Sequence, residues 1–392
     1  VADESGWHWG LFTYLAVMMS LIYAVGYTFF NVPHVAMGYE LSTDYNERTH
    51  LFKWRQFSYA AAGFLTPWFL PLCMWFEGPR SEVAKGSEGV IAVSIIAAAV
   101  ILLTGLPSVF FCREKYQVES VEDKVSFLSA AKLTLGNKPF WLLVVSNFIA
   151  KFCMAITGIF FVFIFLHYLG AGDQKAGAGY LAVFFNAINL ACFLAMAPVA
   201  LLTERIGKKA ALILMLLMSA VAYVSLWFTF SDSPEAYVRF DLPWFGSVSM
   251  HWASLITAAM IGVFTNTMPM INNSMLADVC DLDELRSGRR REAFYGAVFT
   301  TTDKIALGVA LGLQGLLLAY SGFDAKLDHQ TPETIRFWLL ALVVTQPFGF
   351  FVGIVAVLFY PLSRARCHEI RRQLDMRTAA RRASAAQAPP AP

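Results

Sequence analysis

Two lysines lie deep inside long apolar stretches of this sequence, where an ammonium group requires a partner or water. Lys151 and Lys304 are each about twelve residues into their stretch, which corresponds to about 16 Å along a helix. A lysine side chain does not reach the membrane surface from that depth, and charges placed there usually line a polar cavity. We predict that both lysines belong to a substrate- or cation-binding site; the alternative is a structural ion pair.

Each of these lysines requires a negatively charged partner. Asp303 is a poor partner for Lys304, because consecutive helical residues point about 100° apart. Lys304 then needs a carboxylate from elsewhere or a titratable substrate site. In an alternative arrangement, Asp303 pairs with Lys151 across helices.

Polar residues also recur at helical spacing in three apolar stretches. Asn147 lies four residues before Lys151, and Asn266 and Asn273 are seven residues apart, so each pair shares one helix face. Such polar lines favour a hydrated path through the interior of a helical bundle.

The first apolar stretch ends in YTFFNVPHVAMGYE, where Pro33 removes a backbone hydrogen bond and predicts a bend. Thr28 and Asn31 lie about one turn apart at this bend. They could bind a cation or a substrate through their oxygens, or they could simply hydrogen-bond neighbouring helices.

These residues must be positioned by membrane-spanning helices. Hydrophobic residues make up 57% of the chain and charged residues 15%, and nine apolar stretches each reach about 20 residues, enough to cross a bilayer. The stretches are 9–37, 54–76, 90–112, 140–169, 180–202, 210–230, 245–277, 293–320 and 337–362. Most lysines and arginines fall on alternate connectors, which predicts a multi-pass protein of the plasma (inner) membrane with a cytoplasmic C-terminus.

The predicted fold is therefore an all-α polytopic bundle. We divide it into 1–112, the second half of an N-terminal bundle; 113–137, a central cytoplasmic loop; 138–362, a complete six-helix bundle; and 363–392, a basic tail with a disordered Ala/Pro-rich end from Arg381. Because the chain opens at Val1 with three helices before the loop, we expect three further helices upstream; the alternative is a genuine nine-helix protein.

Several classes of function are disfavoured. The positive charge is distributed by topology and forms no basic domain, so no nucleic-acid partner is expected. The six cysteines and seven histidines are scattered, and HExxH and GxSxG motifs are absent, so we expect no cofactor, no bound metal beyond a transported Na⁺, and no enzyme activity.

Two connectors on the predicted cytoplasmic side mix acids closely with bases, beyond what membrane orientation requires. We predict that they form ion pairs of a cytoplasmic gate, which break and re-form during transport. The alternative is ordinary helix capping, with Asp278 and Asp281 paired to the arginines at 289–291. The gate residues are Glu40, Asp44, Glu47, Arg48, Asp278, Asp281, Arg289, Arg291 and Glu292.

The same connectors carry a family resemblance. The segments NVPHVAMGYELSTDYNERTHLFKWR and LADVCDLDELRSGRRREAFYGAVFTTTDK resemble two signatures of the glycoside-pentoside-hexuronide:cation symporters, the melibiose-carrier-like branch of the major facilitator superfamily. Between them, ALLTERIGKK resembles a degenerate copy of the superfamily's Gly-x-x-x-Asp-Arg-x-Gly-Lys turn, with Ala200 and Glu204 replacing Gly and Asp.

The resemblance implies that this chain holds helices four to twelve of twelve. It implies a cation-site role for Thr28, a basic cavity position for Arg55, and a place beside the cation and sugar sites for Lys304. Asn31 replaces a sugar-binding aspartate, and Val35 replaces a stacking aromatic residue, so a galactoside is disfavoured.

Together these features predict a monomeric secondary transporter that couples a small-molecule substrate, a sugar or glycoside, to H⁺ or Na⁺ by alternating access. Alternatives are a carrier of lysophospholipid-type amphiphiles and a non-transporting membrane regulator.

Overall fold

The computed structural model describes residues 61–77, 88–111, 136–170, 173–230, 237–242, 246–288, 292–324 and 329–387, with a few single residues outside these ranges. Contacts divide the chain into two compact units. One comprises Val1–Ala62 and Val90–Asp123, and its described part is mostly α5 (Glu88–Phe111, which begins two residues before Val90). The other comprises Gly63–Gly89 and Lys124–Pro392, and the site described below lies entirely within it.

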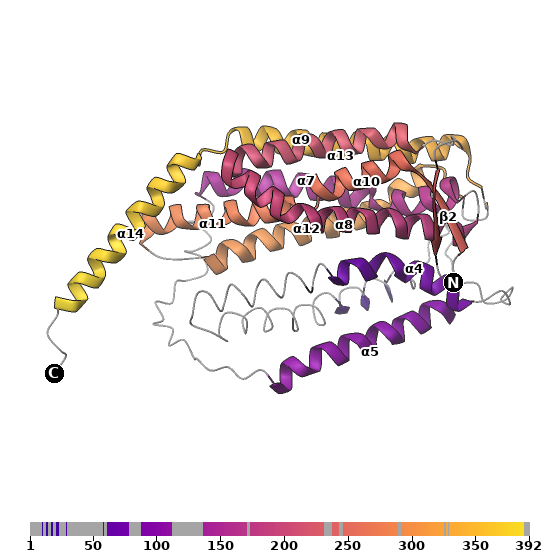
Figure 1. Cartoon of the computed structure of the whole chain (residues 1–392), viewed down its shortest axis with the longest axis horizontal. Coiled ribbons are helices and arrows are strands. Elements are labelled where there is room, and N and C mark those ends of the chain that lie inside the picture. Colours follow the sequence, from indigo (N-terminus) through magenta and orange to yellow (C-terminus); the bar gives the residue numbers. More distant parts are fainter. Residues whose placement is uncertain are drawn as a thin grey trace. The chain divides into compact units, whose positions relative to one another are not determined.

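The second unit consists almost entirely of helices (Figure 1). In chain order they are η2 (Thr66–Trp68), α4 (Phe69–Glu77), α7 (Lys138–Phe163), η3 (Ile164–Leu169), α8 (Gln174–Ile206), α9 (Lys208–Thr229), α10 (Trp252–Phe264), α11 (Met268–Ser287), α12 (Glu292–Tyr320), α13 (Pro332–Leu358) and α14 (Arg364–Gln387). The segment η3 is a π-helical turn that continues α7.

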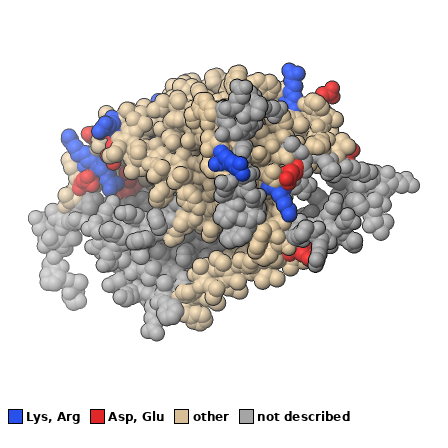
Figure 2. Space-filling view, turned by 45° about the vertical axis from the view of Figure 1, so that its right-hand side comes forward, with Lys and Arg blue, Asp and Glu red and all other residues tan. Residues whose placement is uncertain are grey.

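Apolar helices of membrane-spanning length confirm the predicted helical class. Within the described residues seven helical segments are long and apolar enough to cross a bilayer, and a shorter apolar helix covers Ala61–Phe76. The predicted stretch at 9–37 lies mostly outside the described residues. Large apolar side chains such as Phe228 and Phe351 are exposed, and most of the described surface in Figure 2 is uncharged. Such a surface suits lipid.

Local sequence signals explain where several helices begin and end. Asn137 caps α7 by accepting a hydrogen bond from the Phe140 backbone N–H, with Pro139 in the first turn. Asp173 caps α8 in the same way, and Gly288, with a φ of 69°, ends α11 in the left-handed conformation.

Small residues bring α13 close to α7. A Cβ atom at Gly349 would lie 2.8 Å from the Cys153 side chain, and one at Gly353 would lie 3.1 Å from Ser146 Oγ. Helices α7, α9 and α13 lie side by side (Figure 1), and small interface residues permit this close backbone approach within a membrane.

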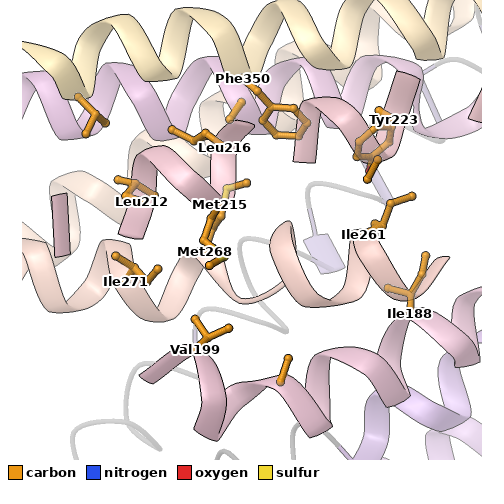
Figure 3. Close-up of a cluster of buried hydrophobic side chains, with 14 of the residues drawn as sticks. Ile188, Val199, Leu212, Met215, Leu216, Tyr223, Ile261, Met268, Ile271 and Phe350 are labelled. Atoms are coloured by element: carbon orange, nitrogen blue, oxygen red, sulfur yellow. The ribbon is translucent and has the colours of Figure 1, made fainter. Parts of the chain in front are cut away.

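The prediction that 245–277 forms one apolar helix was wrong. Residues 246–251 form strand β2 (Gly246–His251), which pairs antiparallel with β1 (Tyr237–Leu242), and a turn at 265–267 separates α10 from α11. The turn is held by Thr265, which donates to Ser219 Oγ at 2.9 Å. Figure 3 shows Met215 of α9 beside Met268, the first residue of α11. Hydrophobic pattern alone did not reveal the break, because both sides of it are apolar.

The C-terminal tail also differs from its prediction. Helix α14 continues to Gln387, although we expected disorder from Arg381. Alanine is the strongest helix former, and four alanines lie between 380 and 386, so the helix persists until shortly before the proline pair at 389–390.

Candidate functional site

Lys151 of α7 and Asp303 of α12 form an ion pair. Lys151 Nζ lies 2.7 Å from Asp303 Oδ2, with 42% of the lysine side chain and 21% of the aspartate side chain exposed. The structure therefore contains the pairing across helices that the sequence left as an alternative. Pairing offsets part of the free-energy penalty of placing both charges within a membrane-spanning bundle.

A chain of amide hydrogen bonds holds the aspartate from its other side. Asn147 Nδ2 donates to Asp303 Oδ1, and Asn272 Nδ2 of α11 donates to Asn147 Oδ1 at 3.1 Å. Both asparagines are buried. In this series of hydrogen bonds each amide N–H donates in the direction of Asp303, so the two asparagines fix the position of the carboxylate.

Asn272, at the far end of this series of hydrogen bonds, carries an acceptor for which the described residues supply no donor. Asn272 Oδ1 is buried and accepts no hydrogen bond from any described residue. Gln346 Oε1 is the second such atom; its amide donates to Thr157 Oγ1 at 2.7 Å between α13 and α7. Buried acceptors of this kind usually bind ordered water or a ligand.

The structure brings together three residues of the predicted binding site: Asn147, Lys151 and Asp303. Lys304, the next residue of α12, is exposed and is not part of this set of hydrogen bonds. Thr28, Asn31 and Arg55 lie outside the described residues.

The prediction that Asn266 and Asn273 share one helix face was wrong, because the two residues do not lie in one continuous helix. Asn266 lies in the turn between α10 and α11, so helical spacing does not relate it to Asn273. Both side chains are exposed, and Asn272, the residue before Asn273, is the asparagine that joins the site. The break in the helix decided which asparagine points inward.

A second polar region, here called the gate cluster, lies at the end of the bundle where α9 begins and α11 ends. Lys208 Nζ pairs with Asp278 at 2.6 Å and donates to the Ser274 carbonyl at 3.1 Å. Arg371 of α14 pairs with Asp281 at 3.1 Å. In Figure 1, α14 joins α11 at this end of the bundle.

The gate cluster also ties helix ends together through backbone carbonyls. Lys209 donates to the carbonyls of Leu358 and Tyr360, each at 2.8 Å, and Arg377 donates to the Leu285 carbonyl at 2.6 Å. Cations at helix C-termini satisfy free carbonyls and interact favourably with the helix dipole.

The predicted partners of the two gate aspartates differ from those observed. The capping alternative paired Asp278 and Asp281 with the arginines at 289–291, but the described partners are Lys208 and Arg371. Both partners are distant in sequence, so only the packing of α9 and α14 against α11 brings them close. The remaining gate residues, or in the case of Glu292 its side chain, lie outside the described part: Glu40, Asp44, Glu47, Arg48, Arg289, Arg291 and Glu292.

Cys367 of α14 reports on the gate cluster. Burial, followed by the nearby Asp278 carboxylate, raises the pKa of its thiol to about 11, and Lys208 partly opposes this rise. At pH 8 roughly one thiol in a thousand is then ionised, and only the thiolate reacts with alkylating agents.

We therefore expect iodoacetamide to modify Cys367 at pH 8 at least about tenfold more slowly than in the unfolded chain, whose thiol pKa is lower. Asp278→Asn should accelerate the reaction and Lys208→Met should slow it further, as measured by mass spectrometry of the peptide containing Cys367. The control is Asp375→Asn, because Asp375 is exposed and is not a cause of this pKa shift. Equal rates in all four proteins would contradict the electrostatic account.

In the ranges that the structure describes, no three His, Cys, Asp or Glu side chains come together as a metal site requires. What the described site offers is one carboxylate, one ammonium group and two amides, inside a bundle of apolar helices. These groups can exchange hydrogen bonds and charge with a small molecule or an ion.

The fold and the site together define a multi-pass helical membrane protein with a charge pair within its bundle. The family model described as MFS/sugar transport protein matches residues 7–364, and the chain belongs to this family. The resemblance to major facilitator transporters and the corresponding fold class are thereby confirmed.

Three relatives illustrate the family. The chain is 23% identical to an uncharacterized symporter of Synechocystis sp., in a match covering 94% of this chain and 78% of the relative. It is 23% identical to the isoprimeverose transporter of Lactiplantibacillus pentosus, covering 91% and 68%. It is 24% identical to an inner membrane symporter of Escherichia coli, covering 93% and 73%.

Proposed function

We propose that this chain is a secondary active transporter that carries a sugar or glycoside together with H⁺ or Na⁺ by alternating access. The observation that carries the proposal is the Lys151–Asp303 pair with its amide chain, since charges within a transporter bundle commonly mark the path of substrate and ion. Family membership and relatives named as symporters and as a sugar transporter support it.

We further propose that Thr28, Asn31, Arg55, Asn266, Asn273 and Lys304 take part, as Asn147, Lys151 and Asp303 do, in binding the substrate or the coupling cation. The gate cluster would close the cytoplasmic end, because its basic residues favour that side of the membrane. The plasma membrane location, the cytoplasmic C-terminus and the monomeric state are part of this proposal.

Uptake into proteoliposomes tests the proposal. The purified chain should accumulate a labelled glycoside, with isoprimeverose as the first probe of a wider panel, above its equilibrium level under an inward H⁺ or Na⁺ gradient. Gramicidin should abolish accumulation, because it collapses both gradients. Equilibration without accumulation would contradict coupling, and no flux of any sugar or amphiphile in the panel would favour a regulator.

A further inference from the structure

Asp303 has both carboxylate oxygens occupied in the described state. Oδ2 accepts from Lys151 Nζ at 2.7 Å, and Oδ1 accepts from Asn147 Nδ2. An ion that reached this carboxylate would have to displace a donor, and it would be repelled by the ammonium group already present. The site in this state is therefore closed to a second cation.

The two donors differ in how firmly they are held. Asn147 is buried and is fixed in turn by Asn272, which is also buried. Lys151 is 42% exposed, and the hydrogen bond described for its ammonium group is the one to Asp303. Asp303 and the asparagines thus form the fixed part of the site, and the long lysine side chain is the part that can leave.

The Lys208–Asp278 pair of the gate cluster provides a contrast within the same unit. Its N–O distance is similar, at 2.6 Å, but Lys208 is also held by the Ser274 carbonyl at 3.1 Å. A lysine with a second anchor is less free to exchange with an ion. The single described anchor of Lys151 therefore distinguishes the Asp303 site from an ordinary structural pair.

We propose that Lys151 is a built-in counterion: its ammonium group occupies the position at Asp303 that a coupling cation takes when the lysine withdraws. The ligand is a monovalent positive charge, which either Na⁺ or a proton can supply. The described groups in contact with the carboxylate are Lys151 and Asn147 of α7, and Lys304 is the next residue of α12 in sequence. The inference deepens the proposed function, since exchange between Lys151 and the cation would couple ion binding to rearrangement of α7 against α12.

Binding measurements on the purified chain test the inference without requiring transport. Lys151→Met removes the built-in charge and leaves Asp303 in need of another cation. If Na⁺ is the cation that replaces the lysine, Lys151→Met should bind ²²Na⁺ at least about tenfold more tightly than the wild-type chain at neutral pH. The double variant Lys151→Met/Asp303→Asn should lose this increase in affinity. Lys151→Arg should behave like the wild type.

If a proton is the cation that replaces the lysine, ²²Na⁺ binding stays unchanged, and infrared spectroscopy is the measurement that detects the replacement. Lys151→Met should show the C=O stretch of a protonated carboxyl group at neutral pH, and the double variant should lack it. Should Lys151→Met aggregate, Lys151→Gln provides the same test, because glutamine keeps a hydrogen bond to Asp303 without the charge.

Lys208→Met is the matched control and should produce neither signal. The inference is overturned if soluble Lys151→Met or Lys151→Gln gains neither ²²Na⁺ binding nor a protonated carboxyl group at Asp303, or if Lys208→Met gains as much. Because these measurements need no substrate, they distinguish failure of this inference from failure of the transport proposal.

Discussion

Asp303→Ala is expected to abolish concentrative uptake and to destabilise the chain. The substitution removes the carboxylate that pairs with Lys151 and accepts from Asn147, so an ammonium group and an amide lose their partner within the bundle. Removing one partner of a fully buried pair typically costs about 3–5 kcal/mol. Since Lys151 is 42% exposed, we expect on the order of 2 kcal/mol here.

Thermal unfolding in detergent and gradient-driven uptake in proteoliposomes measure the two effects of Asp303→Ala. Asp375→Ala, at an exposed position of α14, is the control and should match the wild type in both assays. Wild-type accumulation by the Asp303→Ala protein would remove the pair from the transport mechanism, even if stability fell.

Gly262→Val is expected to prevent normal packing of α10 against α8. A Cβ atom at Gly262 would clash with the Ile188 carbonyl oxygen and would lie 3.0 Å from Ala191 Cβ. The first contact is with backbone, which moves only if a whole helix shifts. We expect a loss of roughly 3 kcal/mol or more, at the upper end of overpacking effects, and most of the protein should aggregate in detergent.

The control for Gly262→Val is Gly308→Val, because a Cβ atom at Gly308 meets nothing within 4 Å among the described residues. Size-exclusion chromatography and thermal unfolding should separate the two variants clearly. Similar losses in both would indicate that valine acts through its helix propensity and not through the α8–α10 contact.

The sequence alone was sufficient to predict the membrane class, the family and the two charged residues that form the pair, but not that they pair with each other. Uninterrupted apolar stretches of spanning length need no tertiary information, and Lys151 and Asp303 are conspicuous because charges at that depth are rare. Helical spacing also placed Asn147 on the same face as Lys151, because that relation exists within a single helix.

What the sequence missed depends on contacts between helices. A turn at 265–267 interrupts the helix before α11, so spacing counted from Asn266 did not show that Asn272 lies in the site. Asp278 pairs with Lys208 and Asp281 pairs with Arg371 because α9 and α14 pack beside α11. Periodicity fixes which residues share a helix face, but it carries no information about which helix that face meets. The sequence by itself thus determined which charges lie within the membrane, and only the tertiary structure decided their partners.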